Sequence, residues 1–141
     1  MYIYLAGPFF KPHEVEAISK IEKELTDKEI LFYSPRWEGV LITQSEEEKQ
    51  ANKKRIYDRN VEMISGASKV LAIIDDRDIG TIWEMGFATG LKIPVITISS
   101  QSYGLNVMLA ESVQAHVLNI NDAIEAILNN SFKGELLKGV F

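Results

Sequence analysis

Short apolar runs alternate with segments of helical periodicity along the chain, and this alternation most restricts how the chain can fold. Five runs rich in β-branched and aromatic residues have the length and composition of strands. They occupy residues 2–6, 30–33, 69–74, 95–98 and 117–118. Because strands joined through helices run parallel, the alternation predicts an α/β fold with a doubly wound parallel five-stranded sheet. We expect the Rossmann-like, flavodoxin-like strand order in a single domain over residues 1–141.

The segments between the strands carry the signals of helices. Apolar residues recur at helical spacing over residues 14–25, which predicts a helix that returns to the start of the sheet. Ser45 and Glu48 have the spacing of a capping box, and we expect them to open a long charged helix that ends near Ile64. The last helix is predicted to begin at Asn121, a suitable N-cap.

Composition excludes several classes of function. With a net charge of −5 and a pI ≈ 5.1, the chain lacks the clustered Lys and Arg that nucleic acids and anionic membranes require of a partner. It has no Cys, hence no thiolate nucleophile or thiolate metal site, which fits a cytoplasmic location. His13 and His116 are far apart in the sequence, so we interpret both as surface or packing residues and predict no metal site. Since the N-terminus leads directly into a strand pattern, no targeting segment or membrane anchor is expected.

The segment after the central apolar run contains two carboxylates, Asp78 and Glu84. Its composition predicts a turn and a helix after a strand, and ligands of open α/β sheets lie at the carboxyl ends of strands. One interpretation of Glu84 is structural, because Thr81 and Glu84 have the spacing of a capping box. The other is chemical: the dipole at a helix N-terminus holds a carboxylate ionised, and apolar neighbours such as Trp83 partly dry it, as a nucleophile requires.

Two further side chains are candidates for binding. Asn60 falls on the inward stripe of the long helix, where an unpaired amide would be costly, so we expect it to bond either backbone or a ligand. Trp37 follows the second predicted strand beside polar residues. It either stacks against a base or covers apolar surface at a loop.

Several common catalytic and binding motifs are absent from the sequence. No G-x-G-x-x-G follows the first strand, no G-x-x-x-x-G-K-[ST] occurs, and there is no G-x-S-x-G elbow. Carboxylate chemistry remains, in which one carboxylate attacks an anomeric carbon while a second group manages the leaving group. A rival use of acidic residues is Mg²⁺ binding by Asp75 and Asp76, as in receiver domains. The acidic pair of receivers, however, follows the first strand, where this chain has Gly7 and Pro8.

Three stretches together resemble the nucleoside 2-deoxyribosyltransferases. They are residues 4–10 (YLAGPFF), the central motif Asp78-x-Gly80-Thr81-x-x-Glu84-x-Gly86-x-Ala88, and Asn106 before the last predicted strand. The similarity in order and length covers nearly the whole chain, and the central motif is its discriminating part. The resemblance implies that residues 1–141 form one nucleoside 2-deoxyribosyltransferase-like domain.

The resemblance also implies roles for individual residues. Glu84 matches the nucleophile that forms a covalent 2-deoxyribosyl-enzyme, and Tyr4 matches the tyrosine that orients it. Asp78 matches the aspartate that holds the sugar 5′-hydroxyl, together with Asn106 from a neighbouring subunit. The sites would therefore be shared between subunits of a homo-oligomer. In some relatives the C-terminal carboxylate reaches the nucleophile, which makes Phe141 a candidate binding residue.

The remaining predicted binding residues are Gly7, Phe9 and Phe10. Apolar side chains here suit a site in which an ester intermediate must outlive water until a second base enters. One position departs from the family, because most relatives have an aspartate, thought to protonate the departing base, where this chain has Asn60. An amide cannot donate a catalytic proton, although it can hydrogen-bond a base edge.

These observations predict a cytoplasmic enzyme that moves 2-deoxyribose from one nucleobase to another by double displacement with retention. It would use no cofactor, and its partners would be a nucleoside and a free nucleobase. The first alternative is a hydrolase of deoxynucleosides or deoxynucleoside 5′-monophosphates, although Asp78 would repel a phosphate and so favours an uncharged 5′-hydroxyl. The second alternative is a non-catalytic nucleoside-binding module in which Glu84 is only a cap.

Overall fold

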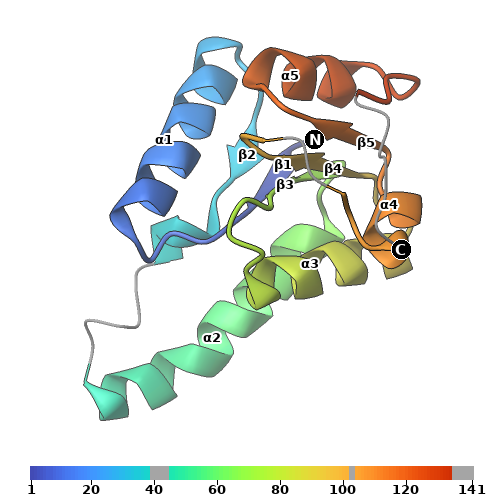
Figure 1. Ribbon diagram of the computed structural model, residues 1–141. Coiled ribbons are helices and arrows are strands. Elements are labelled where there is room, and N and C mark those ends of the chain that lie inside the picture. Colours follow the sequence, from blue (N-terminus) through green and yellow to red (C-terminus); the bar gives the residue numbers. More distant parts are fainter. Residues whose placement is uncertain (39–44, 102–103, 135–141) are drawn as a thin grey trace.

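The computed structural model describes residues 1–38, 45–101 and 104–134. They form a five-stranded sheet in the order β2-β1-β3-β4-β5, in which every pairing is parallel (Figure 1). The strands are β1 (Ile3–Ala6), β2 (Phe32–Tyr33), β3 (Lys69–Ile73), β4 (Val95–Ile98) and β5 (Ala115–Val117). The predicted parallel sheet and its flavodoxin-like order are confirmed.

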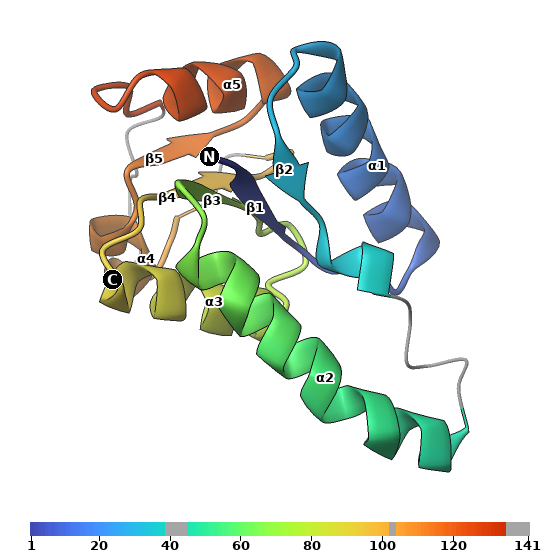
Figure 2. The ribbon, with the colours of Figure 1, turned by 180° about the vertical axis from the view of Figure 1, so that it is seen from behind.

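Helices cover both faces of the sheet. They are α1 (Pro12–Asp27), α2 (Glu46–Ser65), α3 (Ile79–Gly90), α4 (Val107–Ser112) and α5 (Ile120–Leu128), with a short 3₁₀ helix η1 (Pro35–Glu38) after β2. In Figure 1, α1 and α5 lie on one side of the sheet, and α2, α3 and α4 lie on the other. Figure 2 shows the first half of α2 extending beyond the sheet. Within the described residues, no helix is long and apolar enough to cross a membrane.

Two apolar clusters fill the spaces between the sheet and its helices. Strand alternation in β1 sends Ile3 and Leu5 into the cluster beneath α1 and α5, and it sends Tyr4 and Ala6 into the cluster beneath α2 and α3. All of β1 is buried, as expected of a strand inside a sheet that is covered on both faces. The side chain of Tyr4 therefore lies on the α3 side of the sheet, which also carries Glu84.

The direction of strand addition reverses between β1 and β3, which are paired neighbours. The turn after β1 begins at Gly7, and a Cβ at this position would lie 3.2 Å from the Cβ of Ile73 at the end of β3. Glycine thus lets the two strand ends approach closely. Such a reversal point is where open α/β sheets bind ligands, so the fold places the turns after β1 and β3 together at the expected site.

Capping explains where the predicted helix boundaries hold and where they fail. Ser45 Oγ accepts a hydrogen bond from Glu48 N, and Glu48 Oε2 accepts one from Ser45 N, so the predicted capping box of α2 is confirmed. The prediction that Asn121 caps α5 is wrong. The cap is Asn119, whose Oδ1 accepts from Asp122 N at 2.9 Å, and the helix therefore starts earlier.

Strand lengths also differ from the prediction. The second strand covers two of its four predicted residues, and the fifth covers residues 115–117 instead of 117–118. Ile30 packs against the core ahead of β2, whereas Leu31 is exposed, and a hydrophobic run by itself does not distinguish either from a strand residue.

Candidate active site

A cavity of about 470 Å³ opens at the carboxyl ends of β1 and β3, a volume within the roughly 300–1,000 Å³ typical of small-molecule sites. We call it the active-site pocket. Its described lining comes from the turn after β1, η1, α2 and the start of α3: Gly7, Phe9, Phe10, Pro35, Lys49, Ile56, Asn60, Asp78, Gly80 and Glu84. Six of the residues predicted as site residues thus line one cavity.

Glu84 stands in the second turn of α3, too far into the helix to cap it. The interpretation of Glu84 as a capping residue is wrong, because Asp78 is the N-cap and its Oδ2 accepts from Thr81 N at 2.9 Å. Glu84 Oε2 is buried and has no hydrogen-bond partner among the described residues. This oxygen therefore has no protein donor among the described residues to release when it contacts a ligand.

Burial raises the pKa of Glu84 to about 7, the hydroxyl of Tyr4 lowers it, and the charge of Asp78 raises it further. The sequence predicted a carboxylate held ionised by the helix dipole. That expectation is wrong in direction, because the dipole acts mainly on the first turn and burial dominates in the second. The burial of Glu84 agrees with the expected dry surroundings, while the contribution of Trp83 to it stays a prediction.

Tyr4 lies beneath Glu84, fully buried in β1. Burial, followed by the nearby Glu84 carboxylate, raises the pKa of the Tyr4 hydroxyl, so it stays protonated and can donate. Its Oη makes no well-formed hydrogen bond within the described part of the chain. Tyr4 is thus close enough to influence the Glu84 charge, while both groups keep bonding capacity for a ligand.

Asp78 presents a fixed carboxylate to the pocket. Its Oδ2 accepts from both the backbone N and the Oγ1 of Thr81, at 2.9 Å each. These two bonds orient the carboxylate at the helix N-terminus, where negative charge is favoured. Asp78 and Glu84 therefore line the same pocket on successive turns of α3, one carboxylate held by donors and the other free.

Asn60 lines the pocket from α2, as its place on the inward stripe predicted. Its Oδ1 is buried and has no hydrogen-bond partner among the described residues. A buried acceptor without a partner costs about 1–3 kcal/mol unless a ligand supplies the donor. Of the two predicted outcomes, a backbone partner for this oxygen is not found among the described residues, and a ligand as its partner stays a prediction.

Aromatic side chains of Phe9 and Phe10 also line the pocket. The rings of Phe9 and Phe10 are 4.8 Å apart at their centroids, in the turn between β1 and α1. A smaller cavity of about 340 Å³ adjoins the pocket and shares Asn60 and Glu84 with it. It is lined on its far side by Trp83, so apolar surface surrounds the Glu84 carboxylate from two directions.

Trp37 and Asn106 lie away from the pocket of this chain. Trp37 is 56% exposed and packs against the rings of Phe32 and Tyr33, which matches its interpretation as a cover for apolar surface. Asn106 caps α4, where its Oδ1 accepts from Met108 N, and it lines a separate cavity of about 600 Å³. Phe141 lies outside the described residues.

Sequence reasoning missed Lys49 as a pocket residue. Its ammonium pairs with Glu46 at 3.0 Å. Lys49, Ile56 and Asn60 are seven and four residues apart, which is the spacing of one helix face. That spacing could have identified Lys49, but a lysine on a charged helix is normally assigned to the solvent-exposed face.

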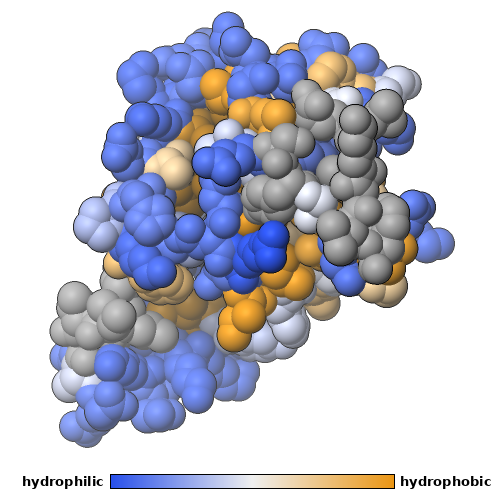
Figure 3. All heavy atoms as spheres, viewed as in Figure 1, coloured by the Kyte–Doolittle hydropathy of each residue, from blue (hydrophilic) through white to orange (hydrophobic). Residues whose placement is uncertain are grey.

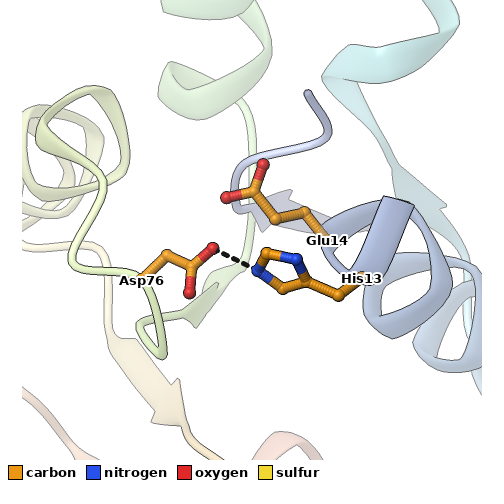
Figure 4. Close-up of side chains that lie close together, drawn as sticks. All are labelled: His13, Glu14 and Asp76. Atoms are coloured by element: carbon orange, nitrogen blue, oxygen red, sulfur yellow. Dashed lines mark hydrogen bonds and ion pairs between the residues drawn. The ribbon is translucent and has the colours of Figure 1, made fainter. Parts of the chain in front are cut away.

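A cluster outside the pocket joins the first turn of α1 to the segment after β3. His13 Nε2 lies 2.7 Å from Asp76 Oδ2, and one ligand atom from each of His13, Glu14 and Asp76 falls within 4.8 Å of the others (Figure 4). These atoms are of a kind that can hold a divalent cation, a grouping that the sequence interpretation of His13 did not foresee. Glu14 Oε1 already accepts from the backbone N of Phe10 and of Lys11.

The same cluster bears on the magnesium alternative. Asp76 is directed toward His13, whereas Asp75 Oδ1 accepts from the backbone N and the Oγ of Ser100. The two neighbouring carboxylates thus engage different elements of the fold. Their arrangement ties three turns together at the carboxyl edge of the sheet.

Comparison with known proteins agrees with this arrangement. A profile of the nucleoside 2-deoxyribosyltransferases matches residues 3–120. The chain belongs to this family. The pocket residues that the family resemblance singled out, from Gly7 to Glu84, all fall within the matched part of this nucleoside 2-deoxyribosyltransferase family member.

Three solved structures have the same fold as this chain. The 2-deoxyribosyltransferase of Bacillus psychrosaccharolyticus aligns with a TM-score of 0.84 and 29% identity, over 96% of this chain and 100% of that one. A conserved protein of Enterococcus faecalis aligns with a TM-score of 0.62 and 20% identity, over 98% and 81%. A CMP N-glycosidase of Clostridium botulinum aligns with a TM-score of 0.60 and 11% identity, over 92% and 100%, and shares the fold alone. No curated protein sequence matches the chain significantly.

Proposed function

We propose that the protein is an enzyme that transfers 2-deoxyribose between nucleobases through a covalent bond to Glu84. The observation that carries this proposal is the buried, unpartnered carboxylate of Glu84, which lies beside Tyr4 and shares a pocket with Asp78. The similarity to a 2-deoxyribosyltransferase over nearly the full length of both chains supports it.

In the first step, an oxygen of Glu84 attacks the anomeric carbon of a 2-deoxynucleoside. The new carbon–oxygen bond forms as the bond to the base nitrogen breaks, and the base nitrogen keeps the electron pair. In the second step, a nitrogen of another base displaces Glu84 and restores the carboxylate. The N–H proton that the incoming base loses passes to water and balances the proton that the departed base takes up. Two inversions at one carbon give net retention.

The acid–base state of Glu84 suits this chemistry. A pKa of about 7 leaves the carboxylate partly ionised at neutral pH, and its dry surroundings keep it reactive. Tyr4 donates toward the carboxylate and restricts its orientation. Asp78, held by Thr81, is left with its Oδ1 to accept a hydrogen bond from the sugar 5′-hydroxyl.

The assembly expected from the family supplies the rest of the site. Asn106 lies in a different cavity of its own chain, so its contribution to the sugar requires a neighbouring copy. The carboxylate of Phe141 is proposed to reach the nucleophile, as in some relatives. Both assignments rest on the resemblance to the family.

The discriminating experiment is product analysis with and without a second free base. Transfer predicts a new deoxynucleoside when the second base is present, in amounts that follow its concentration. Free 2-deoxyribose as the sole sugar product would instead identify a hydrolase. The absence of any turnover, with binding of the nucleoside retained, would favour the binding module, although the loss of the capping role of Glu84 removes that alternative's structural basis.

A further inference from the structure

The active-site pocket is lined by an amide, Asn60, besides its carboxylates. Asn60 belongs to α2 and Glu84 to α3, so the two residues line the pocket from different helices. The Oδ1 of Asn60 and the Oε2 of Glu84 are both buried and lack partners among the described residues. When the bond between the sugar and the base breaks, the base nitrogen receives an electron pair. It must then either take a proton from the enzyme or leave as an anion.

The titratable side chains that line the pocket within the described residues are Lys49, Asp78 and Glu84. Glu84 is the attacking group and must be ionised to attack. Asp78 Oδ2 already accepts two hydrogen bonds from Thr81. Lys49 is eleven residues from Asn60 along α2, or roughly 16 Å at 1.5 Å per residue.

The amide is suited to recognition and unsuited to protonation. A carboxamide offers one acceptor and two donor positions, and it does not give up a proton near neutral pH. The buried Oδ1 of Asn60 can accept from an N–H on the base edge, and the amide nitrogen can donate to a neighbouring base oxygen. Such contacts hold the base without changing its charge.

We propose that Asn60 makes this protein selective for deoxynucleosides whose base is acidic enough to leave as an anion. This inference rests on the proposed function and names its substrate class. Oxo-substituted bases meet the requirement, because ring carbonyl groups spread the negative charge. Glu84 forms its bond to the anomeric carbon, the electron pair goes to the base nitrogen, and the base anion takes a proton from water after it departs.

The test is a series of 2′-deoxyuridines with fluorine, hydrogen or methyl at position 5 of the base, an order of falling base acidity. Single-turnover release of the free base is measured for the wild-type protein and for Asn60→Asp. The wild-type rate is expected to fall steeply along the series, approaching tenfold per unit of base pKa. Asn60→Asp, which supplies a titratable group, is expected to flatten the series and to speed the poorest substrate most.

The matched control is Gln50→Glu, which changes an exposed amide to an acid on the same helix. It should leave the steep series unchanged, and Asn60→Leu should keep the steepness at a lower overall rate. A flat wild-type series, or equal steepness in the wild type and Asn60→Asp, would overturn the inference while base release upholds the proposed function. If no base is released from any member, the proposed function itself fails. Should Asn60→Asp not fold, the wild-type slope still decides.

Discussion

The fold makes Glu84 costly to ionise. Burial and the charge of Asp78 both raise its pKa, and the Tyr4 hydroxyl offsets part of the effect. The difference between about 7 and the usual 4.5 corresponds to at most about 3 kcal/mol of stability lost on ionisation. A carboxylate with a structural role normally accepts hydrogen bonds from protein donors, as Asp78 does from Thr81. The strain on Glu84 is therefore consistent with a chemical role.

Glu84→Gln should stabilise the protein at high pH and abolish turnover. Because the folded state raises the pKa of Glu84, it binds a proton more tightly than the unfolded chain does. The wild-type protein thus loses stability as the pH rises from the unfolded value to about 7. The free energy of unfolding of Glu84→Gln should match wild type at pH 4 and exceed it at pH 8, by up to about 3 kcal/mol. Denaturant unfolding at both pH values measures this, with the exposed Glu47→Gln as control; a pH-independent difference would contradict it.

Tyr4→Phe should shift the pH dependence of turnover. The attacking carboxylate must be ionised, so kcat/KM in the wild type is expected to rise with pH through about 7. Since the Tyr4 hydroxyl lowers the pKa of Glu84, its removal should move the inflection to higher pH. The variant would then be more impaired at pH 6 than at pH 8.5. A uniform loss at every pH would show that Tyr4 packs the site without tuning Glu84.

At the scale of elements, identical spacing leads to different structures. Ser45 and Glu48 form a capping box because Ser45 itself is the N-cap of α2. Thr81 and Glu84 have the same spacing. Asp78, however, accepts the hydrogen bond from Thr81 N, so the helix starts three residues earlier than a cap at Thr81 would place it. The sequence thus predicted α3 and its place after β3, but not its first residue. Local patterns do not state which of several capping side chains wins.

The position of α2 decides the other wall of the pocket. Glu38, at the end of η1, accepts from Tyr33 Oη at 2.9 Å and from Arg55 Nη1 at 2.8 Å. The first contact anchors η1 to the end of β2, and the second holds α2 against η1. These bonds depend on the tertiary arrangement, which is why sequence reasoning did not single out Glu38.

Glu38→Gln should weaken substrate binding more than chemistry. The change keeps the side-chain shape but removes the charge that attracts Arg55, so the wall that carries Ile56 and Asn60 loses a fixed position. We expect KM to rise about five- to tenfold with a smaller change in kcat, and the free energy of unfolding to fall by about 1 kcal/mol. Steady-state kinetics and denaturant unfolding test this. Glu62→Gln, whose exposed carboxylate pairs with Arg59, serves as control and should show neither effect.

At the scale of the whole molecule, the topology gathers residues that are distant in sequence. Gly7, Asn60 and Glu84 meet because β1 and β3 are adjacent and α2 and α3 cover the same face. The strand alternation predicted this edge of the sheet as the site. It could not predict that Asn106 faces a different cavity, because the path after β4 depends on packing that no local pattern encodes.

The surface beside the pocket exposes several apolar side chains. Apolar side chains gather over α3 (Figure 3), where Ile79 and Trp83 are exposed. Trp83 stacks on Phe87 and also packs against Tyr57, so a connected aromatic surface lies next to the Glu84 helix face. Exposed apolar surface of this kind is typical of contacts between subunits.

Shared sites predict that two inactive variants restore each other. Glu84→Gln removes the nucleophile, and Asn106→Ala removes the residue expected from the neighbouring copy. In a mixed assembly, a site that takes Glu84 from an Asn106→Ala chain and Asn106 from a Glu84→Gln chain is complete. With equal amounts and random assembly, about a quarter of the sites are complete, so about a quarter of wild-type transfer should return. The variants are unfolded and refolded together, and transfer is compared with that of each variant refolded alone. Recovery no greater than the sum of the separate variants, with mixed assemblies shown by differential tags, would mean that each chain builds its site alone.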